Sequence, residues 1–134
     1  MNCRELSVKI LNRIINEGAY SNLVLNTELN EYDLSDADKA LTTEIVYGVL
    51  RRKKTLDIII SNFVKDIKLM DKTVINILRS AIYQMNFLDK VPSYAACNEA
   101  VEIAKVYDEG KAPRFINGIL NKVARAQGKI VDGE

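Results

Sequence analysis

The spacing of apolar residues constrains this chain more than any other feature of its sequence. Along most of its length, apolar side chains recur every three or four positions, the period of one face of an α-helix. The run 56–60 is rich in β-branched residues, which favour strands. We still expect a helix there, because the helical period continues in step to Ile67 and no partner strand is evident. The pattern predicts an all-α bundle of six to seven helices.

Prolines, glycines and capping residues mark the expected helix boundaries. Gly18 suits the end of the first helix, and Pro92 and Pro113 suit the starts of the last two. Gly48 lies inside a helix, where it costs roughly 1 kcal/mol relative to alanine, so we expect it to permit a close helix contact. The expected helices lie at about 4–17, from 21, at 35–50, 50–68, 71–87 and 92–108, and from 113 past 123. At residue 50 the sequence leaves open whether the segment 50–68 continues the preceding helix or is a new helix after a bend at the basic run.

Composition narrows the function. The 134 residues suit one domain, and an apolar content of 48% is enough for a core. No apolar run approaches a membrane span and no signal peptide is evident, so the cytoplasm is the expected location. Cys3 and Cys97 are far apart, which indicates a reduced compartment and no metal site. Histidine is absent and no Gly-rich loop follows a strand, so the chain shows no active site.

The net charge of +1 hides a strong asymmetry along the chain. Residues 1–50 carry 4 basic and 8 acidic side chains, a net of −4. Residues 51–90 carry 9 and 4, a net of +5, and residues 91–134 carry 6 and 6. The positive segment begins with Arg51, Arg52, Lys53 and Lys54, which suit phosphate contact, although charge runs are often only solvated surface. Arg114, at the start of the last helix, is a further candidate for phosphate contact.

Two further groups of residues admit more than one interpretation. Tyr20 and Tyr94 lie near helix starts and are candidates for stacking on unpaired bases, whereas Tyr47, Tyr83 and Tyr107 suit core packing. The polar residues of the last two helices are Asn98, Glu99 and Asn117. They suit either a partner surface or a buried hydrogen-bonded clamp that sets the register of the two helices. We favour the structural clamp.

Three segments, in this order and spacing, resemble the NusB-like RNA-binding domain. The segment 44–57, Glu-Ile-Val-Tyr-Gly-Val-Leu-Arg-Arg-Lys-Lys-Thr-Leu-Asp, resembles its middle part. The segments Asn-Glu-Ala-Val-Glu-Ile-Ala-Lys (98–105) and Arg-Phe-Ile-Asn-Gly-Ile-Leu-Asn-Lys-Val (114–123) resemble its C-terminal half. The resemblance covers nearly the whole chain and implies a NusB-like helical bundle over 1–127 that binds RNA.

The family has two branches, and the resemblance implies different partners for each. One is the stand-alone transcription antitermination factor, which binds boxA RNA with ribosomal protein S10 (NusE). The other is the N-terminal domain of the RsmB (Sun/Fmu) rRNA cytosine-C5 methyltransferases. In those proteins a separate C-terminal domain uses S-adenosylmethionine to make 5-methylcytosine in small-subunit rRNA.

The segments Tyr-Gly-Val-Leu-Arg-Arg (47–52) and Val-Pro-Ser-Tyr-Ala-Ala (91–96) look more like the RsmB branch, whereas the length of 134 residues suits the free factor. We favour an rRNA-binding domain that docks on its methyltransferase domain in cis and holds no cofactor itself. Residues 128–134 are then a tail or the start of the linker. The family's RNA-binding face is often assigned to a basic N-terminal helix. Here that helix offers only Arg4, Lys9 and Arg13 in an acidic half.

Overall fold

A computed structural model describes residues 1–108 and 110–132, with the surroundings of their side chains up to residue 126. Within this part of the chain the structure is helical and contains no strand, which confirms the all-α prediction. The elements are α1 (Cys3–Leu11), the π-helical turn η1 (Asn12–Asn16), α2 (Ser21–Glu31), α3 (Asp36–Ser61), the 3₁₀ turn η2 (Ile67–Leu69), α4 (Lys72–Phe87), α5 (Ser93–Tyr107) and α6 (Ala112–Asp132).

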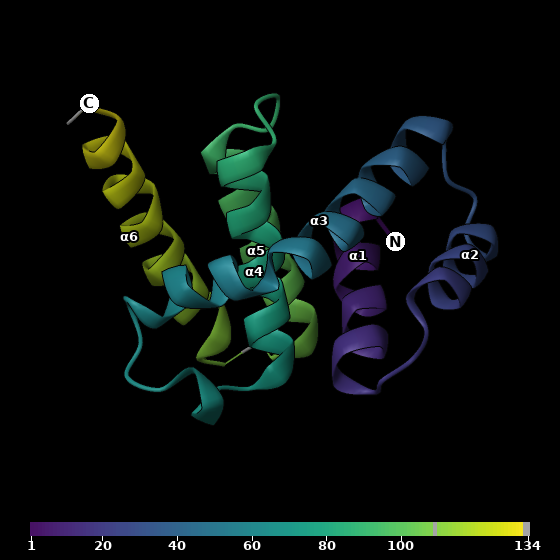
Figure 1. Cartoon of the computed structure of the whole chain (residues 1–134), viewed down its shortest axis with the longest axis horizontal. Helices are drawn as coiled ribbons and strands as arrows, with labels where there is room; N and C mark the ends of the chain where they lie inside the picture. The colour runs from purple at the N-terminus through teal and green to yellow at the C-terminus, as the bar shows by residue number, and fades with distance from the viewer. Residues whose placement is uncertain (109, 133–134) are drawn as a thin grey trace.

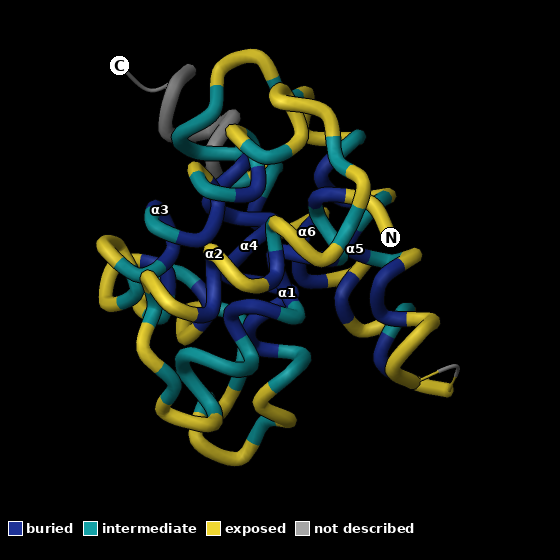
Figure 2. Tube along the Cα trace, turned by 90° about the vertical axis from the view of Figure 1, so that its right-hand side faces the viewer, coloured by how far each residue is buried: buried dark blue, intermediate teal, exposed yellow. Residues whose placement is uncertain are grey.

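Helix α4 is the centre of the bundle. It packs against α1, α3, α5 and α6, and every residue from Ile75 to Gln84 is buried. Figure 2 shows the buried segments gathered at the middle of the molecule, with exposed turns around them. Asn76, Arg79 and Gln84 are buried on this helix and hydrogen-bond to other side chains. Polar groups in a core need such partners, so these contacts also fix how α4 sits against its neighbours.

Helix α3 runs across the molecule and bends at the basic run (Figure 1). It spans Asp36–Ser61, and Arg52 has non-helical angles of φ −111° and ψ 17°. The sequence left open a continuation or a bend, and the structure has one helix with a kink. The prediction that this helix reaches residue 68 is wrong. The helix ends at Ser61, and the chain turns through η2, which still packs Ile67 against the core.

Two glycines behave as their positions predict. Gly18 follows η1 and has a φ of +76°, the left-handed region that glycine enters at little cost. Gly48 lies in α3 directly against the buried ring of Tyr83 in α4, and a methyl group there would overlap that ring. The glycine therefore permits the close approach of the two helices that its cost in a helix suggested.

Helix α6 extends to Asp132 and so passes through most of the segment 128–134 that the sequence predicts as tail or linker. An isolated glycine such as Gly128 lowers helix stability without ending a helix. The last two residues, 133–134, lie outside the described part of the chain. Among the described helices, none is both long and apolar enough to cross a lipid bilayer.

Candidate nucleic-acid interface

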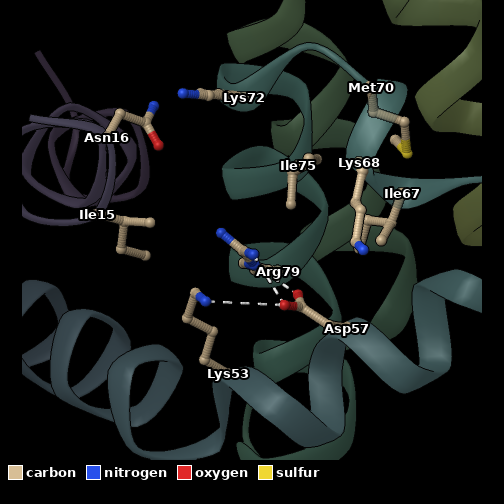
Figure 3. Close-up of a pocket in the computed structure, with 10 residues that line it drawn as sticks. All are labelled: Ile15, Asn16, Lys53, Asp57, Ile67, Lys68, Met70, Lys72, Ile75 and Arg79. Atoms are coloured by element: carbon tan, nitrogen blue, oxygen red, sulfur yellow. Dashed lines mark hydrogen bonds and ion pairs between the residues drawn. The ribbon is translucent and has the colours of Figure 1, made fainter.

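The basic run Arg51–Lys54 lies at the kink of α3, and its side chains point in different directions. Arg52 lies over the ring of Phe87 at the end of α4, with its guanidinium carbon 4.1 Å from the ring centroid. Lys53 instead faces Asp57, with its Nζ 4.0 Å from Asp57 Oδ2 (Figure 3). Arg51, Arg52 and Lys54 are exposed, and Lys53 is half-buried. The run therefore contributes to more than one surface.

A cleft of about 420 Å³ lies beside Lys53, where η1, α3, η2 and α4 meet. Figure 3 shows Ile15 and Asn16 of η1 on one side, the η2 residues on the other, and Arg79 of α4 between them. Four basic side chains and one acidic side chain line the cleft, a net charge of +3. They are Lys53, Lys68, Lys72, Arg79 and Asp57; the remaining lining residues are Ile15, Asn16, Ile67, Met70 and Ile75.

A buried ion pair forms the floor of this cleft. The Arg79 side chain is only 8% exposed, and its Nε and Nη2 donate to the two carboxylate oxygens of Asp57 at 2.7 and 2.9 Å. Its Nη1 donates to Asn76 Oδ1 at 2.9 Å, and Asn76 Nδ2 donates to Asn12 Oδ1 at 2.8 Å. Bidentate charged hydrogen bonds are strong and directional. The floor therefore ties α3, α4 and η1 together.

The cations at the start of the chain are occupied elsewhere. Arg13 Nη1 lies 2.9 Å from Glu28 Oε1, and Lys9 Nζ lies 3.2 Å from Glu28 Oε2. The Glu28 side chain is buried against them in α2. Lys9 also donates to the Tyr32 hydroxyl, and this bond together with Glu28 raises the pKa of Lys9. Arg4 donates to a buried glutamine of α4 at 2.6 Å. The N-terminal helix has few cations in an acidic half of the chain, and these contacts engage the ones that it has.

Arg114 and the predicted polar clamp lie apart from the cleft. Arg114 is exposed in the first turn of α6 and lines hollows formed by residues of α5, α6 and their connection. The predicted clamp needs correction, because Asn98 and Asn117 are exposed and Glu99 is half-buried. Glu99 accepts a 3.4 Å hydrogen bond from the side chain of Asn2.

The cross-helix contact that the clamp was expected to make comes from Cys97. The Cys97 thiol is 3.5 Å from Asn117 Oδ1, which joins α5 to α6. Cys97 is buried, and the helical step of about 100° turns the next residue, Asn98, toward solvent. The hydrophobic stripe of α5 therefore places the thiol, and not the neighbouring amide, at the interface.

The tyrosines separate into two groups. Tyr20 and Tyr94 are 82% and 72% exposed, so their rings are open to a partner, and their role in base stacking stays a prediction. Tyr83 is buried, as predicted, and its hydroxyl donates to Glu44 at 2.7 Å. Tyr47 is half-buried and bonds to Asn22. The prediction that Tyr107 packs in the core is wrong: it is 45% exposed near the end of α5.

Three residues of the cleft, Lys68, Lys72 and Arg79, were not singled out from the sequence. The available signal was the net charge of +5 over residues 51–90, since the run itself supplies only four of the nine cations. Their convergence depends on η2 and on the packing of α4 against α3, which residue spacing does not reveal.

The sequence matches the NusB family over residues 1–125. The chain belongs to the NusB family. Among its relatives is the probable ribosomal RNA small subunit methyltransferase B of Bacillus subtilis, which is 38% identical over 122 residues. That match covers 91% of this chain but only 27% of the methyltransferase. The transcription antitermination protein NusB of Acetivibrio thermocellus is 36% identical over 132 residues, covering 97% of this chain and 91% of that protein.

Solved structures show the same fold. One is a chain in the crystal structure of antitermination factors NusB and NusE in complex with dsRNA. It aligns with a TM-score of 0.84 at 21% identity, over 92% of this chain and 94% of that chain. NusB of T. maritima aligns with a TM-score of 0.83 at 25% identity, over 92% and 88%. The expected family and NusB-like bundle are confirmed, and both branches of the family remain represented among the relatives.

Proposed function

We propose that this chain is the RNA-binding and docking domain of a small-subunit rRNA 5-methylcytosine methyltransferase. In this proposal a catalytic domain in cis binds S-adenosylmethionine, and this domain binds rRNA. The identity of 38% to the Bacillus subtilis methyltransferase supports the methyltransferase branch of the family.

The observation that carries the proposal is the distribution of usable positive charge. Lys9 and Arg13 share the single carboxylate of Glu28. Together with Glu5 and Glu17, Glu28 balances the three cations of residues 1–17, so this end of the chain has no net positive charge to offer a polyanion. The middle of the chain keeps three exposed cations in the run Arg51–Lys54 and a cleft with a net charge of +3. Phosphate contacts supply most of the sequence-independent affinity for nucleic acid. RNA contact therefore belongs to the α3 kink and its surroundings.

A titration with a single-stranded fragment of small-subunit rRNA tests this surface. Changing all four residues of the run Arg51–Lys54 to glutamate should abolish binding or weaken it strongly. The matched control reverses four exposed cations of α5, α6 and their connection, namely Lys105, Lys111, Lys122 and Arg125. Both variants change the net charge equally. Equal loss in the two variants, or no loss in the first, would overturn the assigned surface.

The second candidate function is that of a stand-alone antitermination factor acting with boxA RNA and ribosomal protein S10 (NusE). The observation in its favour is the match to Acetivibrio thermocellus NusB over 91% of that protein. A pull-down with ribosomal protein S10 discriminates, because a tight stoichiometric complex would favour this candidate. A coding sequence that continues after Glu134 into an α/β domain with a Gly-rich loop and a Pro-Cys dipeptide would favour the methyltransferase.

A further inference from the structure

We propose that the cleft between η1, α3, η2 and α4 holds one unstacked nucleotide of a single-stranded RNA. Its phosphate would lie on the cationic rim and its base against the apolar wall. This inference rests on the proposed RNA-binding function and adds to it a defined subsite, away from the exposed part of the basic run.

The rim has the charge that a phosphate requires. Lys53, Lys68 and Lys72 reach the cleft from α3, η2 and α4. The carboxylate of Asp57 is matched by its bidentate bond to Arg79, so the charge of the three lysines remains. Figure 3 shows Lys72 at one end of the cleft and Lys53 at the other, with Arg79 between them.

Arg79 also has N–H donors that are available to a ligand. A guanidinium carries five N–H donors, and three hydrogen bonds, two to Asp57 and one to Asn76, leave two N–H groups with no partner among the described residues. Arginine suits phosphate because its planar fork matches two oxygens at once. The buried network behind Arg79 holds this fork in place before any ligand arrives.

The size and walls of the cleft point to more than a phosphate. About 420 Å³ lies within the usual range of small-molecule pockets, roughly 300–1,000 Å³, whereas a phosphate displaces only a few waters of roughly 30 Å³ each. Ile15 of η1, Ile67 of η2 and Ile75 of α4 line the cleft together with Met70, which follows η2, and offer an apolar surface to a base.

An extruded base occurs in single strands, because bases in a duplex are stacked inside the helix. The π-helical turn η1, a rare form that often marks functional positions, forms one wall of the cleft. Charge, volume, apolar wall and backbone irregularity therefore coincide at one place.

The rim is tested with the double variant Lys68→Gln/Lys72→Gln. The matched control is Lys65→Gln/Lys90→Gln, which removes two exposed lysines of the same basic segment that do not line the cleft. Binding of an oligouridine of about 12 nucleotides is measured by fluorescence anisotropy across a salt series. Each lost phosphate contact should lower the log–log salt slope by about 0.7. The rim variant should therefore lose about 1.4 in slope, roughly a 25-fold loss at 0.1 M relative to 1 M salt.

The base is tested by comparing uridine 5′-monophosphate with inorganic phosphate in backbone amide NMR spectra. We expect the nucleotide to shift the amide signals of Ile67, Met70 and Ile75, and phosphate to leave them in place. Identical shifts with both probes would overturn the nucleotide assignment.

The outcomes separate this inference from the proposed function. RNA binding with an unchanged salt slope in the rim variant would overturn the cleft and leave the proposed function standing. A full chain that binds no RNA at all would overturn the proposed function and this inference with it.

Discussion

Replacing Gly48 with alanine tests the helix contact that supports the basic run. An added methyl group would overlap the ring of Tyr83. That ring cannot move cheaply, because it is buried, its hydroxyl donates to Glu44 at 2.7 Å, and it stacks on Phe87 with 5.4 Å between ring centroids. Arg52 in turn lies over Phe87. The overlap should therefore disturb both the packing of α3 on α4 and the position of one cation of the run.

The expected magnitude is a balance of two effects. Overpacking a core costs about 1–3 kcal/mol, and glycine to alanine in a helix returns up to about 1 kcal/mol. The matched control is Gly118→Ala in α6, where an added methyl group meets no atom within 4 Å and only the gain applies. The two variants should therefore differ by about 1–3 kcal/mol in the free energy of unfolding, or about 4–12 °C in Tm at about 4 °C per kcal/mol.

Urea unfolding followed by far-ultraviolet circular dichroism measures this difference. A double-mutant cycle with Tyr83→Ala identifies its source, because the cost of Gly48→Ala should vanish once the ring is gone. A Gly48→Ala variant as stable as Gly118→Ala, or a cost that persists without the ring, would contradict the overlap with Tyr83.

Three further predictions follow from the ion pairs and the thiols. Glu28→Gln should release the two cations that it binds and steepen the salt dependence of RNA binding by up to about 1.4; an unchanged slope in the anisotropy titration would mean that they stay away from RNA. Asp57→Asn should leave the buried guanidinium of Arg79 without a counter-charge and lower the free energy of unfolding, measured in urea, by about 2 kcal/mol. The cost is less than for a fully buried pair because the Asp57 side chain is 26% exposed. A loss under about 0.5 kcal/mol would contradict this. Burial raises the pKa of Cys3 and Cys97 above the ordinary value of 9.0, so the folded state keeps both thiols protonated where the unfolded state would ionise them. Their contribution to stability is complete below pH 9.0 and should fall as the pH rises above it, and urea midpoints of the Cys3→Ala/Cys97→Ala variant should fall less over that range.

Apolar spacing and capping residues predicted the helices well, because both signals come from interactions between residues that are close in the sequence. The helix expected at 71–87 begins where predicted, because Asp71 caps it by accepting hydrogen bonds from the backbone amides of Thr73 and Val74. The sequence also allowed a bend at the basic run and indicated a close helix contact at Gly48. The end of α3 at Ser61 was not, because the helical period continues past the point where the chain leaves the helix.

The candidate site was harder to predict, since its parts are far apart in the sequence. Asp57 and Arg79 are 22 positions apart, and Arg13 and Glu28 are 15 apart. Periodicity indicates which face of a helix is buried, but it does not indicate which charged residues form ion pairs. The sequence therefore revealed where positive charge accumulates along the chain, and only the fold shows which cations are neutralised.

The buried polar residues of α4 connect the stability of the bundle to its candidate site. An apolar stripe alone would let neighbouring helices slide, whereas a buried arginine with one matching carboxylate accepts a single register. Arg79 fixes the register of α4 by pairing with Asp57 of α3 and by bonding to Asn76, which in turn bonds to η1. These are three of the elements that line the cleft. The pair that sets the register thus also sets the spacing of the cations, so its loss should weaken folding and RNA binding together.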